Sequence, residues 1–212
     1  MNIQEISKEI QNFVDDFPLN SSSPWELMKT FQNHQFEDKS DGYPGVKISP
    51  NSKLITGKNC TIQPSAVING TVILGDNVFI GDYSMLRGFV FIGSNCVIGS
   101  YNEISRSIIG SSTKISHRND IFDSIVGKNC WLTSNVSIHN VRLDLGNISV
   151  KWHDKETEIP SRFGCIIEDN VTIGIWAKIM PGTVIPQNKN ILGPCLITPR
   201  KIRKFQMNSE LL

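Results

Sequence analysis

The chain has 212 residues and a formal net charge of +1, enough for one fair-sized domain with an appendage and too little charge to argue for nucleic acid or an acidic surface. No apolar run approaches the roughly 18 residues that a membrane span needs. The opening MNIQEISKEI lacks the basic start and apolar core of a signal peptide. We therefore expect a cytoplasmic protein without a membrane span.

Residues 1–45 carry helical signals. The segment SPWE at 23–26 is typical of a helix start, with Ser23 as the cap and Glu26 completing a capping box. We expect two short helices and the linker DKSDGYPG to cap the open end of the following domain. The first helix is indicated by an apolar stripe at helical spacing: Ile3, Ile6, Ile10, Phe13 and Phe17.

From residue 46 to residue 198, an aliphatic residue returns about every six positions, with one long interruption. This period fits neither a helix nor simple hairpins. It fits a coil in which three straight edges, about 18 residues together, close one triangular turn, and successive turns pair as parallel strands. The expected inward residues are Ile62, Ile68, Leu74, Ile80, Leu86, Ile92, Ile98, Ile104, Ile109, Ile115, Ile121, Val126, Leu132, Ile138, Ile167, Ile173, Ile179, Ile185, Ile191 and Ile197.

Four of the five cysteines occupy one place in this repeat, four positions after its aliphatic residue: Cys60, Cys96, Cys130 and Cys195. Elsewhere that place holds small residues such as Ala66, so we interpret the cysteines as core residues. No CxxC spacing indicates zinc or redox chemistry, and we expect no disulfides.

Residues 141–165 interrupt the period with a polar insertion. Such a loop is usually functional or disordered, and we favour a functional loop because insertions in repeat proteins gather on the binding face. We expect residues 199–212 to form a tail or a helix. Their basic residues Arg200, Lys201, Arg203 and Lys204 predict a solvated run, with contact to an anion as the alternative.

The segment ISHRND, residues 115–120, keeps the repeat's aliphatic residue but adds His117, Arg118 and Asp120. An imidazole is the side chain best suited to accept a proton near neutral pH. A zinc site is disfavoured, because the repeat puts His117 and His139 on different faces of the coil and no third histidine lies close. Convergence of histidines between subunits stays open.

These features resemble the hexapeptide-repeat acyltransferases, whose fold is a left-handed parallel β-helix. The segments HRNDIFDSIVGKNCWLTSNVSIHN, from residue 117, and SRFGCIIEDNVTIG, from residue 161, resemble most closely one particular domain. It is the acetyltransferase domain of the bifunctional glucosamine-1-phosphate acetyltransferases that are also UDP-N-acetylglucosamine pyrophosphorylases. The resemblance implies an all-β solenoid over residues 46–198. It also implies acetyl-CoA as co-substrate, a sugar phosphate or nucleotide sugar as acceptor, and a homotrimer with the site between subunits.

The resemblance also implies roles for individual residues. His117 corresponds to the catalytic base, Glu103 to the carboxylate that supports it, and Asn140 to an asparagine of the acceptor site that could aid catalysis. Arg87 corresponds to the phosphate-binding arginine. The repeat register places Arg87 and Asn140 on one face of the coil and His117 on its neighbour, so a shared site has to form between subunits.

Four positions depart from the family pattern: Ser105 replaces a lysine, Asp120 and Val141 replace tyrosines, and Trp131 replaces an asparagine. Asp120 and Trp131 are candidate replacement contacts to the acceptor, as is Asp123. The departures support the alternative of a non-catalytic trimeric β-helix module for binding or assembly. A metal-dependent hydratase, similar to the carbonic-anhydrase-like branch of the fold, is a third hypothesis.

Overall fold

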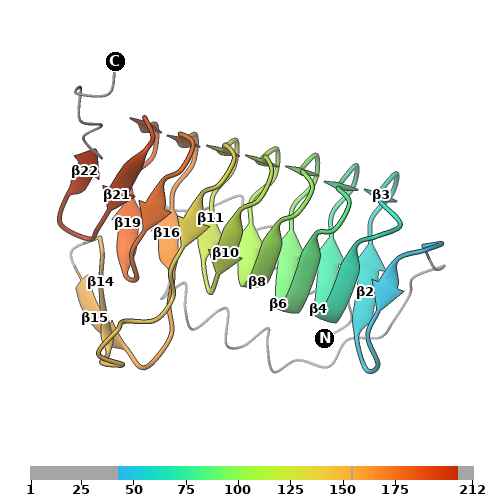
Figure 1. Ribbon diagram of the computed structural model, residues 1–212, viewed down its shortest axis with the longest axis horizontal. Coiled ribbons are helices and arrows are strands. Elements are labelled where there is room, and N and C mark those ends of the chain that lie inside the picture. Colours follow the sequence, from blue (N-terminus) through green and yellow to red (C-terminus); the bar gives the residue numbers. More distant parts are fainter. Residues whose placement is uncertain (1–42, 154, 205–212) are drawn as a thin grey trace, which may run out of the picture.

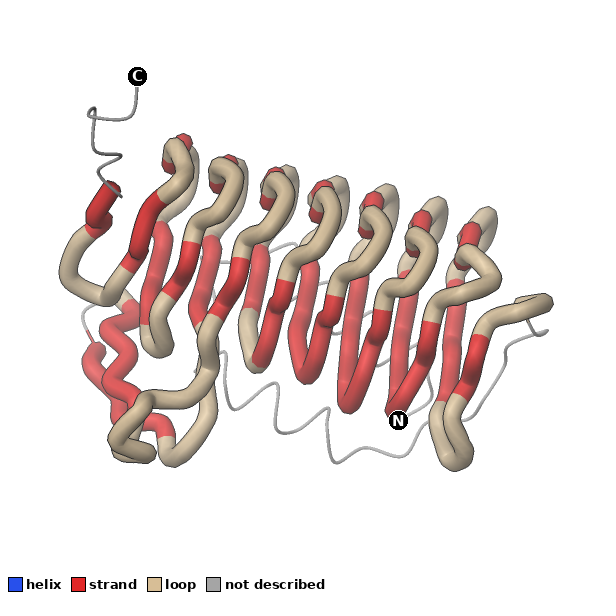
Figure 2. Tube along the Cα trace, in the orientation of Figure 1, coloured by secondary structure: helices blue, strands red, loops and turns tan. Residues whose placement is uncertain are grey.

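The computed structural model describes residues 43–153 and 155–204, which form a solenoid of parallel strands with no helix among them (Figure 1). The coils stack side by side along the long axis of the molecule (Figure 2). The stack confirms the solenoid expected from the six-residue period. The helical cap predicted for residues 1–45 lies almost wholly outside the described residues.

Each coil has three faces, which follow one another along the chain. The first face is a seven-stranded parallel sheet. Its strands are β3 (Thr61–Ile62), β5 (Phe79–Ile80), β7 (Val97–Ile98), β9 (Lys114–Ile115), β12 (Trp131–Leu132), β17 (Thr172–Ile173) and β20 (Asn190–Ile191).

The second and third faces join into one sheet because three long strands run around the corner between them: β4 (Val67–Leu74), β6 (Met85–Ile92) and β8 (Glu103–Ile109). The second face adds β1 (Lys47–Ile48), β10 (Asp120–Phe122), β13 (Ser137–Ile138), β18 (Lys178–Ile179) and β21 (Cys195–Ile197). The third face adds β2 (Lys53–Thr56), β11 (Ile125–Val126), β16 (Cys165–Ile167) and β19 (Thr183–Ile185).

The register explains why Ile109 follows Ile104 after five positions instead of six. On the first face, Phe79 pairs with Val97 and Val97 with Lys114, so the turn shortens from 18 residues to 17. The shortening occurs at the corner between the second and third faces, where the pairing of β6 with β8 shifts between Arg87 and Val90.

The core confirms the inward series. Every aliphatic position of the repeat belongs to one cluster and is at most 7% exposed. Burial of each such side chain is worth about 1.5–3 kcal/mol, and only stacking provides it. All five cysteines are free; Cys96, Cys130 and Cys195 lie inside this cluster and Cys60 packs against it.

The insertion at 141–165 folds into a hairpin of β14 (Ile148–Trp152) and β15 (Lys155–Ile159), which are antiparallel. It lies at the C-terminal end of the coil, with β14 beside β19 (Figure 1). Buried hairpin residues pack with outward-facing residues of the third face in a second apolar cluster, which includes Ile148, Val150, Trp152, Ile125 and Ile166.

Beyond the last coil, β22 (Ile202–Lys204) turns back and pairs antiparallel with β21. A strand therefore stands within the segment expected to be a tail or helix; residues 205–212 lie outside the described part. No helix long and apolar enough to cross a membrane occurs within residues 43–153 and 155–204.

Candidate functional site

His117 follows β9 at the end of the first face, and its side chain is exposed. Its Nδ1 accepts the backbone N–H of Ser100 at 3.0 Å. The turn itself is fixed from inside the coil, where the Nδ2 of Asn102 donates to the carbonyl of Ser116 at 2.8 Å. Asn102 is 1% exposed, and its Oδ1 accepts from the Nδ2 of the fully buried Asn119. Buried amides thus hold the histidine's backbone rigidly.

The bond from Ser100 selects a tautomer of His117. In a neutral imidazole one nitrogen accepts and the other carries the proton, so acceptance at Nδ1 places the proton on Nε2. In this arrangement Nε2 donates a hydrogen bond towards solvent. For Nε2 to accept a proton as a general base, the ring has to leave Ser100 and donate from Nδ1 to another group.

Beside His117, the corner between the first and second faces has exposed side chains at positive φ. Tyr83, Tyr101, Arg118 and Trp176 have φ between 57° and 61°. The corner between the third and first faces holds mainly asparagines at the equivalent conformation, which asparagine tolerates well; they are Asn59, Asn77, Asn95, Asn129, Asn170 and Asn188. Bulky residues at such positions are strained, and strain of this kind gathers at functional sites.

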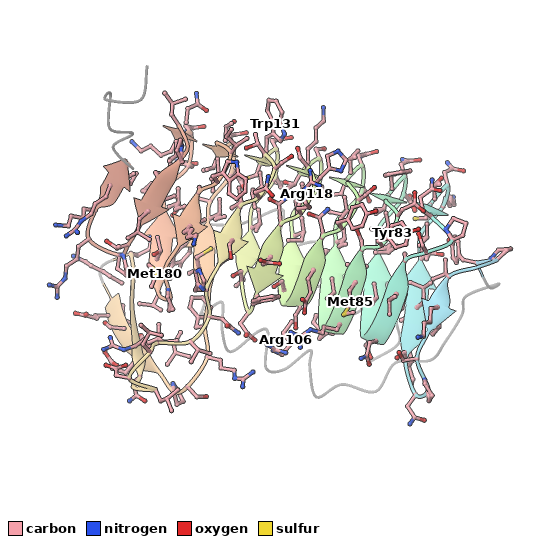
Figure 3. The ribbon with its side chains drawn as sticks, in the orientation of Figure 1. Tyr83, Met85, Arg106, Arg118, Trp131 and Met180 are labelled. Carbon is pink, nitrogen blue, oxygen red and sulfur yellow. The ribbon has the colours of Figure 1, made fainter. Side chains whose placement is uncertain are left out.

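The aromatic residues of this corner are open to solvent. The rings of Tyr83 and Tyr101 stack with centroids 5.0 Å apart, and Trp176 is 58% exposed. Trp131 is 49% exposed on the first face, where its Nε1 donates to Ser116 at 3.1 Å. In Figure 3, Trp131 is at the upper edge of the molecule, and Arg118 and Tyr83 lie below it, just above the broad strands. His117 therefore lies among exposed aromatic side chains.

The outer side of the second face carries charged side chains in successive coils. Arg87 binds Glu103, with Nε 2.5 Å from Oε1, and its guanidinium lies 5.6 Å from the ring centroid of Phe122. The register stacks Arg87, Ser105 and Phe122 in one row. The small Ser105 between them lets the arginine reach the ring, and the buried Ser105 hydroxyl has no partner among the described residues.

A second ion pair lies at the corner of the second and third faces (Figure 3). Arg106 binds Asp123 through two hydrogen bonds of 2.6 and 2.8 Å, and Asn140 donates from Nδ2 to the same carboxylate. The hydrogen bond to Asp123 raises the pKa of Arg106. Gly88 makes room for Arg106, because a Cβ at Gly88 would lie 2.8 Å from the arginine's Cγ.

Asp120 lies between Glu103 and Ser137 in the register of the second face. Its partial burial, followed by the neighbouring Glu103, raises the pKa of the Asp120 carboxyl, while Ser137 and His139 act in the opposite direction. Asp120 is therefore a carboxyl group that holds its proton more readily than an exposed aspartate.

The structure thus brings Arg87, Glu103 and Asp120 onto the second face and Asn140 to its corner, and leaves His117 and Trp131 on the first face. Arg87 and His117 lie on different faces, as the register predicts. Within one chain, Glu103 binds Arg87 and does not contact His117, so the carboxylate support implied for His117 is not made by its own subunit.

Arg106 is not among the site residues expected from the sequence. Its signal in the sequence is its position, since the residues one and two coils earlier at this corner are Gly88 and Gly70 respectively, both at positive φ like Arg106 itself. A charged residue at a turn position that holds glycine in the two preceding coils is a candidate for a functional role, and its partner Asp123, at φ 46°, occupies the same position one coil later. Among the described residues, no group of three His, Cys, Asp or Glu side chains is placed to hold a metal ion.

Comparison with known proteins agrees with the repeat. The family described as bacterial transferase hexapeptide (six repeats) matches residues 53–88 and 71–106. The bifunctional protein GlmU of Methanocaldococcus jannaschii is 38% identical over 96 residues, which are 45% of this chain and 24% of GlmU. GlmU of Methanococcus maripaludis is 40% identical over 96 residues, which are 45% of this chain and 23% of that GlmU. The aligned part thus spans about a quarter of these relatives' length.

The putative uncharacterized acetyltransferase YaiX of Escherichia coli is 31% identical over 113 residues, 52% of this chain and 49% of YaiX. Among solved structures, the UDP-N-acetylglucosamine acyltransferase of Francisella novicida gives a TM-score of 0.44 at 17% identity, covering 77% of this chain and 71% of that one. LpxA of Acinetobacter baumannii gives a TM-score of 0.42 at 15% identity, and the match covers 79% of this chain and 72% of LpxA. The structure is thus a β-solenoid of stacked parallel coils, and its six-residue repeat is similar to that of the bacterial transferase hexapeptide family over residues 53–106.

Proposed function

We propose that the protein is an acetyl-CoA-dependent acyltransferase that acetylates an amine or hydroxyl group of a sugar phosphate or nucleotide sugar. Its active site lies between the subunits of a homotrimer, with His117 of one subunit facing the charged second face of the next. Relatives named as acetyltransferases support the reaction class. The resemblance of residues 117–140 and 161–174 to the acetyltransferase domain of the bifunctional glucosamine-1-phosphate enzymes supports a sugar-linked acceptor.

One observation carries the proposal: the chain divides its chemical groups between two adjoining outer faces. His117 is on the first face, and Arg87, Glu103, Asp120 and the Arg106–Asp123 pair are on the second or its far corner. The corner between the two faces is convex, so one molecule cannot close both around a ligand. A second copy can bring its second face against the first.

The exposed corner aromatics support the same arrangement. Tyr83, Tyr101 and Trp176 flank the line where the two faces meet, and each is more than half exposed. Large apolar residues gathered on a surface mark interaction sites, and closed symmetric homo-oligomers are the common outcome of self-association. Burying these rings between subunits would also exclude water from the reaction.

In the proposed reaction, the acceptor's nitrogen or oxygen attacks the thioester carbonyl carbon. The C–S bond breaks, and the proton lost by the acceptor passes to His117 and then to the departing thiolate of coenzyme A. For this, His117 leaves the Ser100 N–H and turns to Glu103 of the partner subunit, whose carboxylate accepts a hydrogen bond from the Nδ1–H of His117. A carboxylate there fixes the tautomer with Nε2 free.

The second face suits a sugar phosphate or nucleotide sugar better than a bare anion. Arg87 and Arg106 are each already engaged by a carboxylate, Glu103 and Asp123 respectively. Each guanidinium has further N–H donors for a phosphate. The carboxylates, together with Asp120, can accept hydrogen bonds from sugar hydroxyl groups or an amine.

The test is release of coenzyme A thiol from acetyl-CoA in the presence of a panel of sugar phosphates and nucleotide sugars. We expect one acceptor class to give turnover, and His117→Ala to lower kcat by about 10²–10⁴-fold, the range for losing a general base. His153→Asn is the control, because His153 lies on the hairpin at positive φ, which asparagine accepts.

Gel filtration of both variants checks that the assembly persists. Absence of turnover with every acceptor, together with no calorimetric binding of acetyl-CoA, would contradict the proposal and favour a non-catalytic assembly module. In that reading the Ser100 bond to His117 is purely structural.

A further inference from the structure

A pocket of about 410 Å³ lies at the C-terminal end of the coil, away from His117. One wall is the hairpin, through Ile148, Ser149, Lys151 and Glu156, with Arg142 just before it. The other wall is the turn between β21 and β22, residues 198–200. Pro181 lies between the two walls.

Strand alternation aims polar side chains into this pocket. Ile148, Val150 and Trp152 of β14 are buried, whereas Ser149 and Lys151 between them are not. The strand is pressed close to the coil at Gly182, where an added Cβ would lie 2.4 Å from the carbonyl oxygen of Ser149. The hairpin wall is therefore held against the solenoid.

The opposite wall is a tight, well-bonded turn. The hydroxyl of Thr198 donates to the carbonyl of Lys201 at 3.0 Å and accepts the Lys201 N–H at 3.1 Å. The pairing of β22 with β21 then closes the turn behind Arg200. The basic run seen in the sequence is thus partly built into a folded wall.

The lining is basic. It contains Arg142, Lys151 and Arg200 against a single carboxylate, Glu156, which already accepts a 2.5 Å hydrogen bond from Ser149. Arg142 is held from outside the lining by Asp144. Among the described residues, neither Lys151 nor Arg200 lies within 4.0 Å of a carboxylate oxygen. Lys151 and Arg200 thus line the cavity without an ion pair to any residue that the structure describes, which gives the cavity a positive charge suited to an anionic ligand.

We infer that this pocket binds a phosphate-bearing small molecule, with Lys151 and Arg200 as its principal contacts and Arg142 at its rim. Two or more phosphate oxygens can accept hydrogen bonds from both walls at once, which favours a phosphate or diphosphate group over a monovalent anion. The inference stands on the pocket alone and does not depend on acyl transfer.

Both a coenzyme A molecule and a nucleotide sugar carry the required diphosphate. Isothermal titration calorimetry of the full chain with inorganic pyrophosphate measures binding of the diphosphate group alone. Titrations with coenzyme A and with UDP-N-acetylglucosamine show which of the two molecules binds more tightly. N-acetylglucosamine, which has no phosphate, is the negative control. We expect at least one phosphate ligand to bind, with an affinity that falls as salt rises.

The variant is Lys151→Gln combined with Arg200→Gln, and the matched control is Lys47→Gln, an exposed lysine on β1 at the other end of the coil. Both replaced pocket residues are exposed, so the fold should persist, and circular dichroism checks it. We expect binding to weaken by at least about tenfold in the double variant and to stay unchanged in the control. Absence of binding by all three phosphate ligands, or equal affinities in the double variant and the control, would overturn the inference.

Discussion

The ion pair of Arg106 and Asp123 provides a quantitative test of how the second-face corner is built. Removing one partner of a fully buried pair costs roughly 3–5 kcal/mol. Here the Asp123 side chain is 10% exposed and that of Arg106 is 23% exposed. Asp123→Ala also leaves Asn140 without its acceptor. Because solvent screens part of the loss, we expect the free energy of unfolding to fall by about 2–3 kcal/mol.

Urea denaturation followed by tryptophan fluorescence measures this loss, and a double-mutant cycle with Arg106→Ala isolates the pairwise contribution. We expect a coupling energy above about 1 kcal/mol. The matched comparison is Arg142 with Asp144, whose hydrogen bonds are also bidentate but whose side chains are 48% and 60% exposed. Its coupling should be much weaker because solvent screens it. Equal coupling in the two cycles would refute the view that burial at the corner stabilises the Arg106 pair.

Asp120→Asn should raise the melting temperature at pH 7, because burial raises the pKa of Asp120 and its ionised form therefore destabilises the fold. The gain in melting temperature should shrink as pH falls, because the carboxyl of Asp120 binds its proton at a higher pH in the native state than in the unfolded state. Thermal melts between about pH 4 and 8 measure this, and a gain that stays constant over this range would contradict the prediction. Gly70→Ala should lower the urea midpoint more than Gly88→Ala, because its Cβ would meet the backbone oxygen of Gly88 at 2.3 Å, whereas a Cβ at Gly88 meets a side chain; the reverse order would contradict this. Burial raises the pKa of Cys130 to about 12, so iodoacetamide at mildly alkaline pH should modify it only after unfolding, and mass spectrometry of the native protein would detect any exception.

The solenoid could be predicted from the sequence because its physical cause is local and repeated. An inward residue such as Leu86 or Ile104 recurs at a fixed spacing, and only a stacked coil buries all of them. The same spacing assigned Arg87 and His117 to different faces, since position within the repeat determines the face. The hairpin was also within reach: ISVKW at 148–152 alternates apolar and polar residues, as a half-buried strand does.

The partners of the charged residues could not be predicted in this way. Whether Glu103 binds Arg87 or His117 depends on side-chain direction around a corner, which the repeat does not encode. The contact of Arg87 with Phe122 requires a small residue at 105, and that becomes visible only when three coils are stacked. The pocket joins Lys151 to Arg200, which are far apart in the sequence and meet only because the hairpin folds back onto the last coil.

Complementation between two inactive variants tests whether the active site is shared between subunits. His117→Ala and Arg87→Ala chains, each inactive alone, are co-expressed with different tags, and hybrid assemblies are purified through both. A site is intact when the subunit that supplies its histidine keeps His117 and the neighbour that supplies its arginine keeps Arg87. If the two chains assemble at random in equal amounts, about one quarter of the sites are intact. Acetyl-transfer activity of the mixture, before selection by the tags, should therefore return to about one quarter of the wild-type value. Hybrids as inactive as their parents, although the same subunits assemble normally, would contradict the account.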